Sequence, residues 1–266
     1  MTYAGDRLIL DADSHLMELP DFLTRHAVAA VRDLIPALGA STTGNFDIGS
    51  HYDRSGHDDE TRSRLLELGD HLTKGPKWHE ALGAFSGSER GEALDLLGFR
   101  RQVVFSSFCA RLIFETEPLG VRYEIAGAHN RAMAEFCDHD DRLLGVAMVP
   151  LDDPARALAE IEAADELGLA AVWIASDAPG GRSPGHVEHE PIWATLAERR
   201  LPFILHVGSS PLTVEDPWMN DGRPQKSTAR GGAEVIGSKD LTVIHQTAQR
   251  FVSMLVLDGV LERHPD

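Results

Sequence analysis

Five short and nearly continuous apolar runs recur along the chain, and they constrain its fold more than any other feature. They read RLILDAD at 7–13, RQVVFSS at 101–107, LLGVAMVP at 143–150, LAAVWIAS at 169–176 and LPFILHVG at 201–208. Runs of this kind are typical of strands that helices cover on both faces, because both rows of side chains are then buried. The pattern therefore predicts a sheet with helices packed on its two faces.

Amphipathic segments between these runs predict helices. In 152–168, Asp153 is placed to cap a helix, Pro154 to open it and Gly168 to end it. Strands and helices then alternate, which favours a parallel sheet with right-handed crossovers. The predicted buried faces are Leu158, Ile161, Ala164 and Leu167 in this helix, Val121, Ile125, Ala128, Ala132 and Phe136 in 121–136, and Ile192, Trp193, Leu196 and Ala197 after Pro191; a last helix is predicted at 245–262.

Two features depart from a regular barrel. The segment 16–92, rich in Gly, Ser, Asp and His, is far longer than the roughly 2 to 6 residues that usually connect a strand and a helix. We expect it to form a cap inserted after the first strand. Five predicted strands are also fewer than the eight of a complete (β/α)₈ barrel. With no linker between segments, one domain over 1–266 is the simplest organisation.

Charge and composition exclude several classes of partner. The chain has 25 Lys and Arg against 42 Asp and Glu, a net charge of −17, and no compact basic cluster. Nucleic acid and anionic membrane surfaces are therefore poor partners. The sequence has neither a signal-peptide pattern nor a long uncharged apolar run, and Cys109 and Cys137 lack ligand spacing. We expect a cytoplasmic protein with reduced cysteines, and the sequence leaves a homodimer open.

Polar residues alternate at the end of the first apolar run. Asp11, Asp13 and His15 project to one side if the strand continues to His15. A carboxylate and an imidazole on one side can bind a first-row metal such as zinc. Alternatively, the aspartates cap backbone amides at a strand end. The spacing alone favours this second interpretation.

His206 is a second polar residue at the end of a buried run. A lone histidine in such a position is more often a hydrogen-bonded core residue than a ligand. In parallel barrels, however, catalytic groups lie at the carboxyl ends of strands, where both His206 and the Asp13/His15 pair are predicted. Together the two polar positions favour a functional site.

The order of these motifs resembles the amidohydrolase-related family that includes aminocarboxymuconate semialdehyde decarboxylase. The motifs are the first-strand pattern D-x-(ligand)-x-H, then GVAMVPLDDPARALAEIEAADELGLAAVWI and PIWATLAERRLPFILHVG. The resemblance runs from about residue 8 to the end, weakest across the insertion, and implies a metal-dependent TIM-like (β/α)₈ barrel. It matches Asp13 and His15 to the first-strand metal ligands and His206 to the fifth-strand ligand, with Asp11 as a leading aspartate that is not a ligand. Many relatives have histidine at the position of Asp13.

The same resemblance implies a cofactor and a reaction. The run AAVWIASDA has no lysine to form a bridging carbamate, so one divalent metal ion is expected, with zinc favoured and manganese as the alternative. The expected reaction is non-oxidative decarboxylation of a small aromatic or unsaturated carboxylate; metal-dependent hydrolysis of an ester, amide or lactone is the alternative. The family's acid/base aspartate follows the eighth strand, beyond Asp266. This implies a C-terminally truncated barrel whose catalytic residue is not assigned, and leaves open an inactive fragment.

Each of the weaker candidate functional residues also has a purely structural interpretation. Arg111 is placed to meet an anionic substrate or to form a surface salt bridge. His245 is placed to contact substrate or to be a polar residue in the first turn of a helix. GRSPG at 181–185 and HYDRSGHDDE at 51–60 are interpreted as a surface loop and as solvated polar surface, although they contain a hydrolase-like Ser183 and a cluster of His and Asp.

Overall fold

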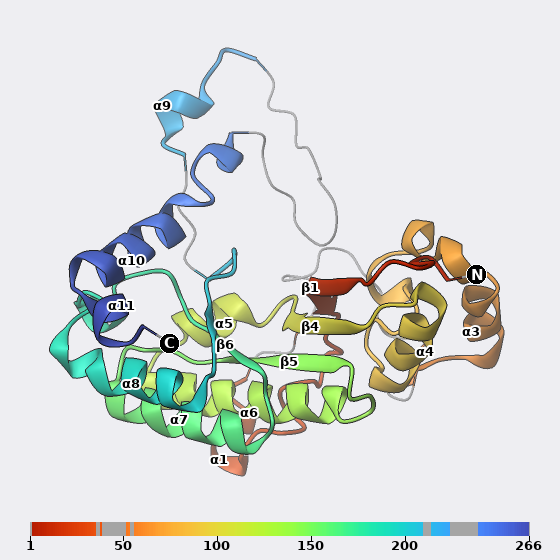
Figure 1. Cartoon of the computed structure of the whole chain (residues 1–266), viewed down its shortest axis with the longest axis horizontal. Helices are drawn as coiled ribbons and strands as arrows, with labels where there is room; N and C mark the ends of the chain where they lie inside the picture. Colours follow the sequence, from red (N-terminus) through yellow and green to blue (C-terminus); the bar gives the residue numbers. More distant parts are fainter. Residues whose placement is uncertain are drawn as a thin grey trace.

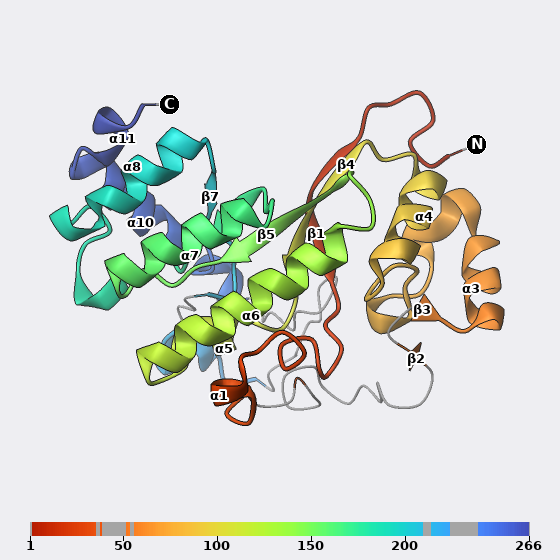
Figure 2. The same ribbon diagram turned by 90° about the horizontal axis from the view of Figure 1, so that it is seen from below.

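The structure is a computed structural model that describes residues 2–35, 38, 52–53, 56–209, 214–223 and 239–265. Its centre is a five-stranded sheet in the order β1-β4-β5-β6-β7, in which every neighbouring pair is parallel. The sheet is curled into part of a TIM-like barrel (Figures 1 and 2), which confirms the predicted fold class. The strands are β1 Leu10–Leu16, β4 Arg101–Ser106, β5 Leu143–Met148, β6 Ala171–Trp173 and β7 Phe203–Ile204.

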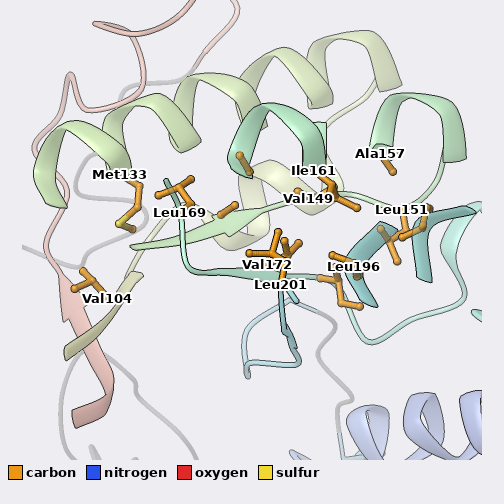
Figure 3. Close-up of a cluster of buried hydrophobic side chains, with 14 of the residues drawn as sticks. Val104, Met133, Val149, Leu151, Ala157, Ile161, Leu169, Val172, Leu196 and Leu201 are labelled. Atoms are coloured by element: carbon orange, nitrogen blue, oxygen red, sulfur yellow. The ribbon is translucent and has the colours of Figure 1, made fainter. Parts of the chain in front are cut away.

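Helices cover the outer face of this sheet. Met133, Ile161 and Leu196 come from three successive helices and pack against Val104, Val149 and Val172 of the strands and their ends (Figure 3). Full burial of an aliphatic side chain of this size contributes roughly 1.5–3 kcal/mol, so this layer supplies much of the stability. The helices that follow the sheet strands are α5 Ala110–Glu115, α6 Leu119–Cys137, α7 Pro154–Glu166, α8 Glu190–Arg199, α10 Gln246–Leu257 and α11 Val260–Arg263.

Helix α7 forms for the reasons that its sequence indicated. The Asp153 side chain accepts hydrogen bonds from the backbone N–H groups of Ala155 and Arg156, and Gly168 ends the helical segment with a φ of +76°. The predicted buried face is only partly right: Ile161 and Ala164 are buried, whereas Leu167 is 40% exposed. Leu167 is the C-cap residue after the last helical position, so helical spacing no longer places its side chain on the buried face.

Two further expectations need correction. The predicted helix over 245–262 is divided, because α10 ends at Leu257 and α11 begins after Gly259, which has a φ of +73°. A left-handed residue of this kind cannot continue an α-helix. In addition, the first strand is not covered on both faces. β1 is an edge strand, and Leu10 is 62% exposed.

Residues 56–97 form a lobe beside β1 (Figures 1 and 2). Its small core contains Leu65, Leu82 and Ala93. Part of the predicted cap, 16–92, lies outside the described residues, and its role as a cap stays a prediction. The elements of this part of the chain are α1 Ala29–Arg32, the antiparallel pair β2 Tyr52–Asp53 and β3 Gly56–His57, α3 Asp59–Leu66, the 3₁₀ turns η1 Gly69–Lys74 and η2 Trp78–Glu80, and α4 Gly87–Leu97.

The interpretation of 51–60 as solvated surface is wrong at His57. This side chain is buried, and its Nδ1 lies 2.8 Å from Oε2 of Glu89. His51 lies outside the described residues. A sequence-local cluster of polar residues therefore contains one half of a buried ion pair whose other half comes from α4, 32 residues later.

The remaining short elements connect these parts. Ser183, in the hydrolase-like motif, hydrogen-bonds to Asp258 in a partly exposed loop, as expected for a surface role. None of the helices in the described part of the chain has the length and apolar character needed to cross a bilayer. The short elements are η3 Pro179–Gly181, η4 Val187–His189, α9 Asp216–Met219 and η5 Asp240–Thr242.

Candidate metal centre

Curling of the sheet brings its two edge strands together at one point. In a flat sheet, four spacings of about 4.8 Å would separate β1 from β7 by about 19 Å. Instead, Oδ1 of Asp13 on β1 lies 3.1 Å from Nε2 of His206, which follows β7. Asp13 Oδ1 also lies 3.3 Å from Nε2 of His15. The three side chains that the sequence singled out therefore meet, with one ligand atom of each within 4.8 Å of the others.

Asp11 lies beside this group but faces other partners. Its carboxylate accepts hydrogen bonds from the Asp13 backbone N–H at 3.2 Å and from the Gln102 side chain at 3.0 Å. The pairing of β1 with β4 is irregular between Asp11 and Ser14, so simple alternation does not hold across this stretch. Asp11 thus caps a backbone N–H group, whereas Asp13 faces the two histidines.

The distances within the group fit ligands that share one ion. Two ligand atoms that are each about 2.1 Å from a metal, at an angle of 90–109°, lie about 3.0–3.4 Å apart. The contacts of Asp13 with His15 and His206 both fall in this range. A carboxylate with two imidazoles is also a donor mixture that zinc and other first-row metals accept. The residues present therefore fit a single divalent metal ion.

Both histidines are oriented by the backbone. Nδ1 of His15 lies 3.1 Å from the carbonyl oxygen of Ser106, and Nδ1 of His206 lies 2.7 Å from that of Val207. A carbonyl only accepts hydrogen bonds, so Nδ1–H donates in both of these contacts. Each Nε2 faces the carboxylate of Asp13, and a cation bound between them would take the Nε2 lone pair. This is the arrangement in which metal-binding histidines are usually held.

Burial favours the neutral form of His15. Burial, and then the neighbouring His206, lower the pKa of His15, although Asp13 acts in the opposite direction. The ring of Phe105 lies below both imidazoles, with centroids 5.7 Å from His15 and 4.8 Å from His206. Trp173 lies 4.7 Å from His206. The Asp13 side chain is 71% exposed, so the group is closed by aromatic rings on one side and open to solvent on the other.

Comparison with known families identifies the fold. A family model described as Amidohydrolase matches residues 85–266, which is more than half of the chain and includes His206. The chain belongs to the amidohydrolase family. The match does not extend to Asp13 and His15, and no curated protein matches this amidohydrolase chain.

Several solved structures share the amidohydrolase fold. An amidohydrolase from Mycobacterium avium subsp. paratuberculosis K-10 is 18% identical with a TM-score of 0.65, covering 98% of this chain and 71% of its own. The 2,6-dihydroxybenzoate decarboxylase from Rhizobium is 16% identical with a TM-score of 0.56, covering 97% and 64%. The 5-carboxyvanillate decarboxylase from Novosphingobium aromaticivorans DSM 12444, complexed with manganese, is 19% identical with a TM-score of 0.58, covering 100% and 66%.

These likenesses establish the fold and not the reaction. The amidohydrolase chain spans 64% to 71% of the length of the three proteins. The position of an acid/base aspartate beyond Asp266 stays a prediction.

Among the described residues, the two weaker candidates, Arg111 and His245, form no hydrogen bond or ion pair with Asp13, His15 or His206. The Arg111 side chain is 80% exposed and pairs with Glu115 at 2.8 Å, which is the surface salt bridge that the sequence allowed. His245 is exposed at the start of α10 and makes no capping hydrogen bond with its side chain. A role in substrate binding stays a prediction for both.

Sequence reasoning missed a buried polar network beneath His15. Glu18, Ser106 and His129 are each at most 1% exposed and are joined by hydrogen bonds. The only signal in the sequence is Glu18 itself, an acidic residue between apolar neighbours in LMEL at 16–19. A buried charged residue of this kind needs partners that a single sequence does not identify.

Proposed function

We propose that Asp13, His15 and His206 bind one divalent metal ion, with zinc favoured and manganese as the alternative. The observation that carries this proposal is the convergence of one carboxylate and two backbone-oriented imidazoles from the opposite edges of the sheet. Carboxylate and imidazole ligands suit zinc, and the manganese in the similar 5-carboxyvanillate decarboxylase supports the alternative.

The reaction proposed for the complete protein is non-oxidative decarboxylation of a small aromatic or unsaturated carboxylate. A bound metal would polarise a substrate oxygen and stabilise negative charge that develops during the reaction. Asp13, His15 and His206 would hold that ion. Phe105 and Trp173 pack against His206 and keep water from its buried side. Two of the similar structures are decarboxylases of aromatic acids, and this supports the choice of substrate class.

The charge of the site supports a metal-dependent route for an anionic substrate. Within the described residues, the side chains of Asp13, His15 and His206 form no ion pair or hydrogen bond with a lysine or arginine. The chain as a whole carries a net charge of −17. A cation bound by these three side chains would therefore supply the positive charge that attracts a substrate carboxylate.

Hydrolysis of an ester, amide or lactone is the second candidate. It is favoured by the similarity to the structure from Mycobacterium avium, which is described as an amidohydrolase and has a TM-score of 0.65. The same metal ligands serve both reactions, so the three residues do not separate them.

Metal analysis with matched variants tests the proposed centre. The chain is loaded with zinc or manganese, passed through a desalting column and analysed by mass spectrometry. We expect one equivalent of metal in the wild type and in Asp11→Ala, and a loss of at least tenfold in affinity in Asp13→Ala and His206→Ala. Asp11 is the control because it is a carboxylate on the same strand with other partners. Equal metal content in all four proteins would rule the centre out.

Product analysis separates the two reactions. Protein expressed from the complete reading frame is incubated with 2,6-dihydroxybenzoate, 5-carboxyvanillate and a set of esters and lactones. Release of CO₂ without acid supports decarboxylation, whereas release of acid without CO₂ supports hydrolysis. If the complete protein binds metal and yields neither product, both assignments fail. The same assay on residues 1–266 alone tests whether this part is an inactive fragment.

A further inference from the structure

Glu18 is a buried carboxylate that uses both of its oxygens. It lies just beyond β1, is 1% exposed, and accepts a hydrogen bond from the Ser106 hydroxyl at 2.6 Å. It also accepts backbone N–H groups from Phe108 at 2.9 Å and from Ser107 and Cys109 at 3.2 Å each. A buried carboxylate is tolerated only with such compensation. The segment that follows β4 is thus wrapped around one side chain from the end of β1.

Ser106 joins this carboxylate to the candidate metal centre. Its side chain contacts Glu18, and its backbone carbonyl accepts the hydrogen bond from Nδ1 of His15 at 3.1 Å. The position of the carbonyl depends on the conformation of the peptide between Ser106 and Ser107. Both sides of that peptide are held by Glu18. Glu18 is therefore connected to His15 through Ser106 without contacting it.

Helix α6 holds the same serine from the opposite side. Nε2 of the fully buried His129 lies 3.0 Å from the Ser106 hydroxyl oxygen, and its Nδ1 lies 2.9 Å from Oδ1 of Asn130. Asn130 is fixed by the backbone of Met148, from which its Oδ1 accepts a hydrogen bond at 2.8 Å and to which its Nδ2 donates one at 3.2 Å. Ser106 is consequently joined by hydrogen bonds to the segment after β1 and to α6, and through His129 and Asn130 to β5.

We propose that Glu18 is a positioning residue for His15, acting through Ser106. This proposal rests on the proposed metal centre. Glu18 sets the Ser106 carbonyl, the carbonyl holds the Nδ1–H form of His15, and that form directs Nε2 toward Asp13 and His206. Partners of this kind commonly change metal affinity by 10- to 100-fold when they are removed.

The test uses Glu18→Gln in the 266-residue chain. Glutamine has the same shape, but its side-chain NH₂ group only donates and cannot accept the hydrogen bonds that the carboxylate accepts. We expect the dissociation constants for zinc and for manganese, measured by calorimetry, to rise about 10-fold or more. In the metal-free protein, ¹⁵N NMR of the imidazoles should change from a single Nδ1–H form of His15 in the wild type to a mixture of tautomers in the variant.

Glu89→Gln is the matched control. Glu89 is also a buried carboxylate, and it accepts backbone N–H groups from His57 and Gly83 within the lobe. The loss of either buried carboxylate should lower the thermal midpoint. Glu89→Gln should leave the metal dissociation constant within twofold of the wild-type value and His15 in one tautomer.

The outcomes separate this inference from the metal centre itself. A folded Glu18→Gln variant with wild-type metal affinity and a single His15 tautomer would overturn the positioning role. If Glu18→Gln does not fold, Ser106→Ala replaces it, because it removes the shortest Glu18 hydrogen bond and keeps the carbonyl. The same two readouts decide, and unchanged values refute the proposal. If Asp13→Ala binds metal normally, the metal centre fails, while the tautomer measurement still judges Glu18.

Discussion

Replacement of Arg90 by methionine should destabilise the fold markedly, because Arg90 joins the lobe to β1 from a buried position. Its guanidinium donates to the Gly83 carbonyl at 2.6 Å, the Ser14 hydroxyl at 2.7 Å and the His15 carbonyl at 2.8 Å. Burial lowers the pKa of Arg90 to about 10, so the group is still charged at neutral pH. Methionine keeps much of the apolar length of the side chain, but it removes the three hydrogen bonds and the cation–π contact of the guanidinium with the Phe136 ring.

The magnitude follows from these contacts. Hydrogen bonds from a charged donor contribute about 1.5–3 kcal/mol each, which gives roughly 4–9 kcal/mol for three. Relief of the cost of burying the guanidinium returns several kcal/mol. The net loss in the free energy of unfolding should be about 2–4 kcal/mol. At about 2–4 °C per kcal/mol, this lowers the thermal midpoint by roughly 5–15 °C.

Urea denaturation followed by circular dichroism measures this loss. Arg62→Met is the control, because Arg62 pairs with Glu92 in the same lobe but on its surface, and its removal should leave the urea midpoint unchanged. A free energy of unfolding for Arg90→Met within 1 kcal/mol of the wild-type value would refute the assignment of Arg90 as the link between α4 and β1.

Two further predictions concern the lobe and the core. Burial lowers the pKa of His57, but hydrogen bonding and attraction to Glu89 outweigh it and raise the pKa, while the same pair lowers the pKa of Glu89. The contribution of His57 to stability is thus complete below pH ~6.5 and is lost as the pH rises through the raised pKa of the folded state. The free energy of unfolding of the wild type, measured by urea titration, should therefore fall over this pH range. His57→Gln should make that free energy less dependent on pH. Ile161→Ala should cost about 2–5 kcal/mol in the same assay because the side chain is fully buried, and a loss no larger than that of Leu167→Ala, at a 40% exposed position, would contradict the packing.

The strands were predictable because burial on both faces leaves a strong signal in the sequence. The runs at 101–107, 143–150 and 169–176 each contain a strand of the sheet. The cap of α7 was predictable for a similar reason, since Asp153 and Pro154 act on backbone groups within a few residues. The division of the last helix was missed, because Gly259 is tolerated within a helix and only the packing of α10 and α11 selects its left-handed conformation.

The candidate site was only partly predictable. The sequence placed Asp13, His15 and His206 at strand ends, but their distances depend on how far the sheet curls, and this depends on all five strands together. The roles of Asp11 and Asp13 were distinguished by the resemblance to the amidohydrolase-related family. Their spacing could not distinguish them, because the irregular pairing of β1 breaks simple alternation. The hydrogen-bond partners of Glu18 lie 88 to 91 residues away, and Glu89, the ion-pair partner of His57, lies 32 residues away. Both separations are beyond the reach of local patterns.

X-ray absorption spectroscopy of the chain loaded with one equivalent of zinc tests the central claim most directly. A metal held by Asp13, His15 and His206 predicts nitrogen and oxygen neighbours at about 2.0–2.2 Å with outer-shell scattering from two imidazole rings. The imidazole signal should fall to one ring in His206→Ala. A spectrum with sulfur at about 2.3 Å, or an imidazole signal that His206→Ala leaves unchanged, would contradict the assignment of these three residues as the metal ligands.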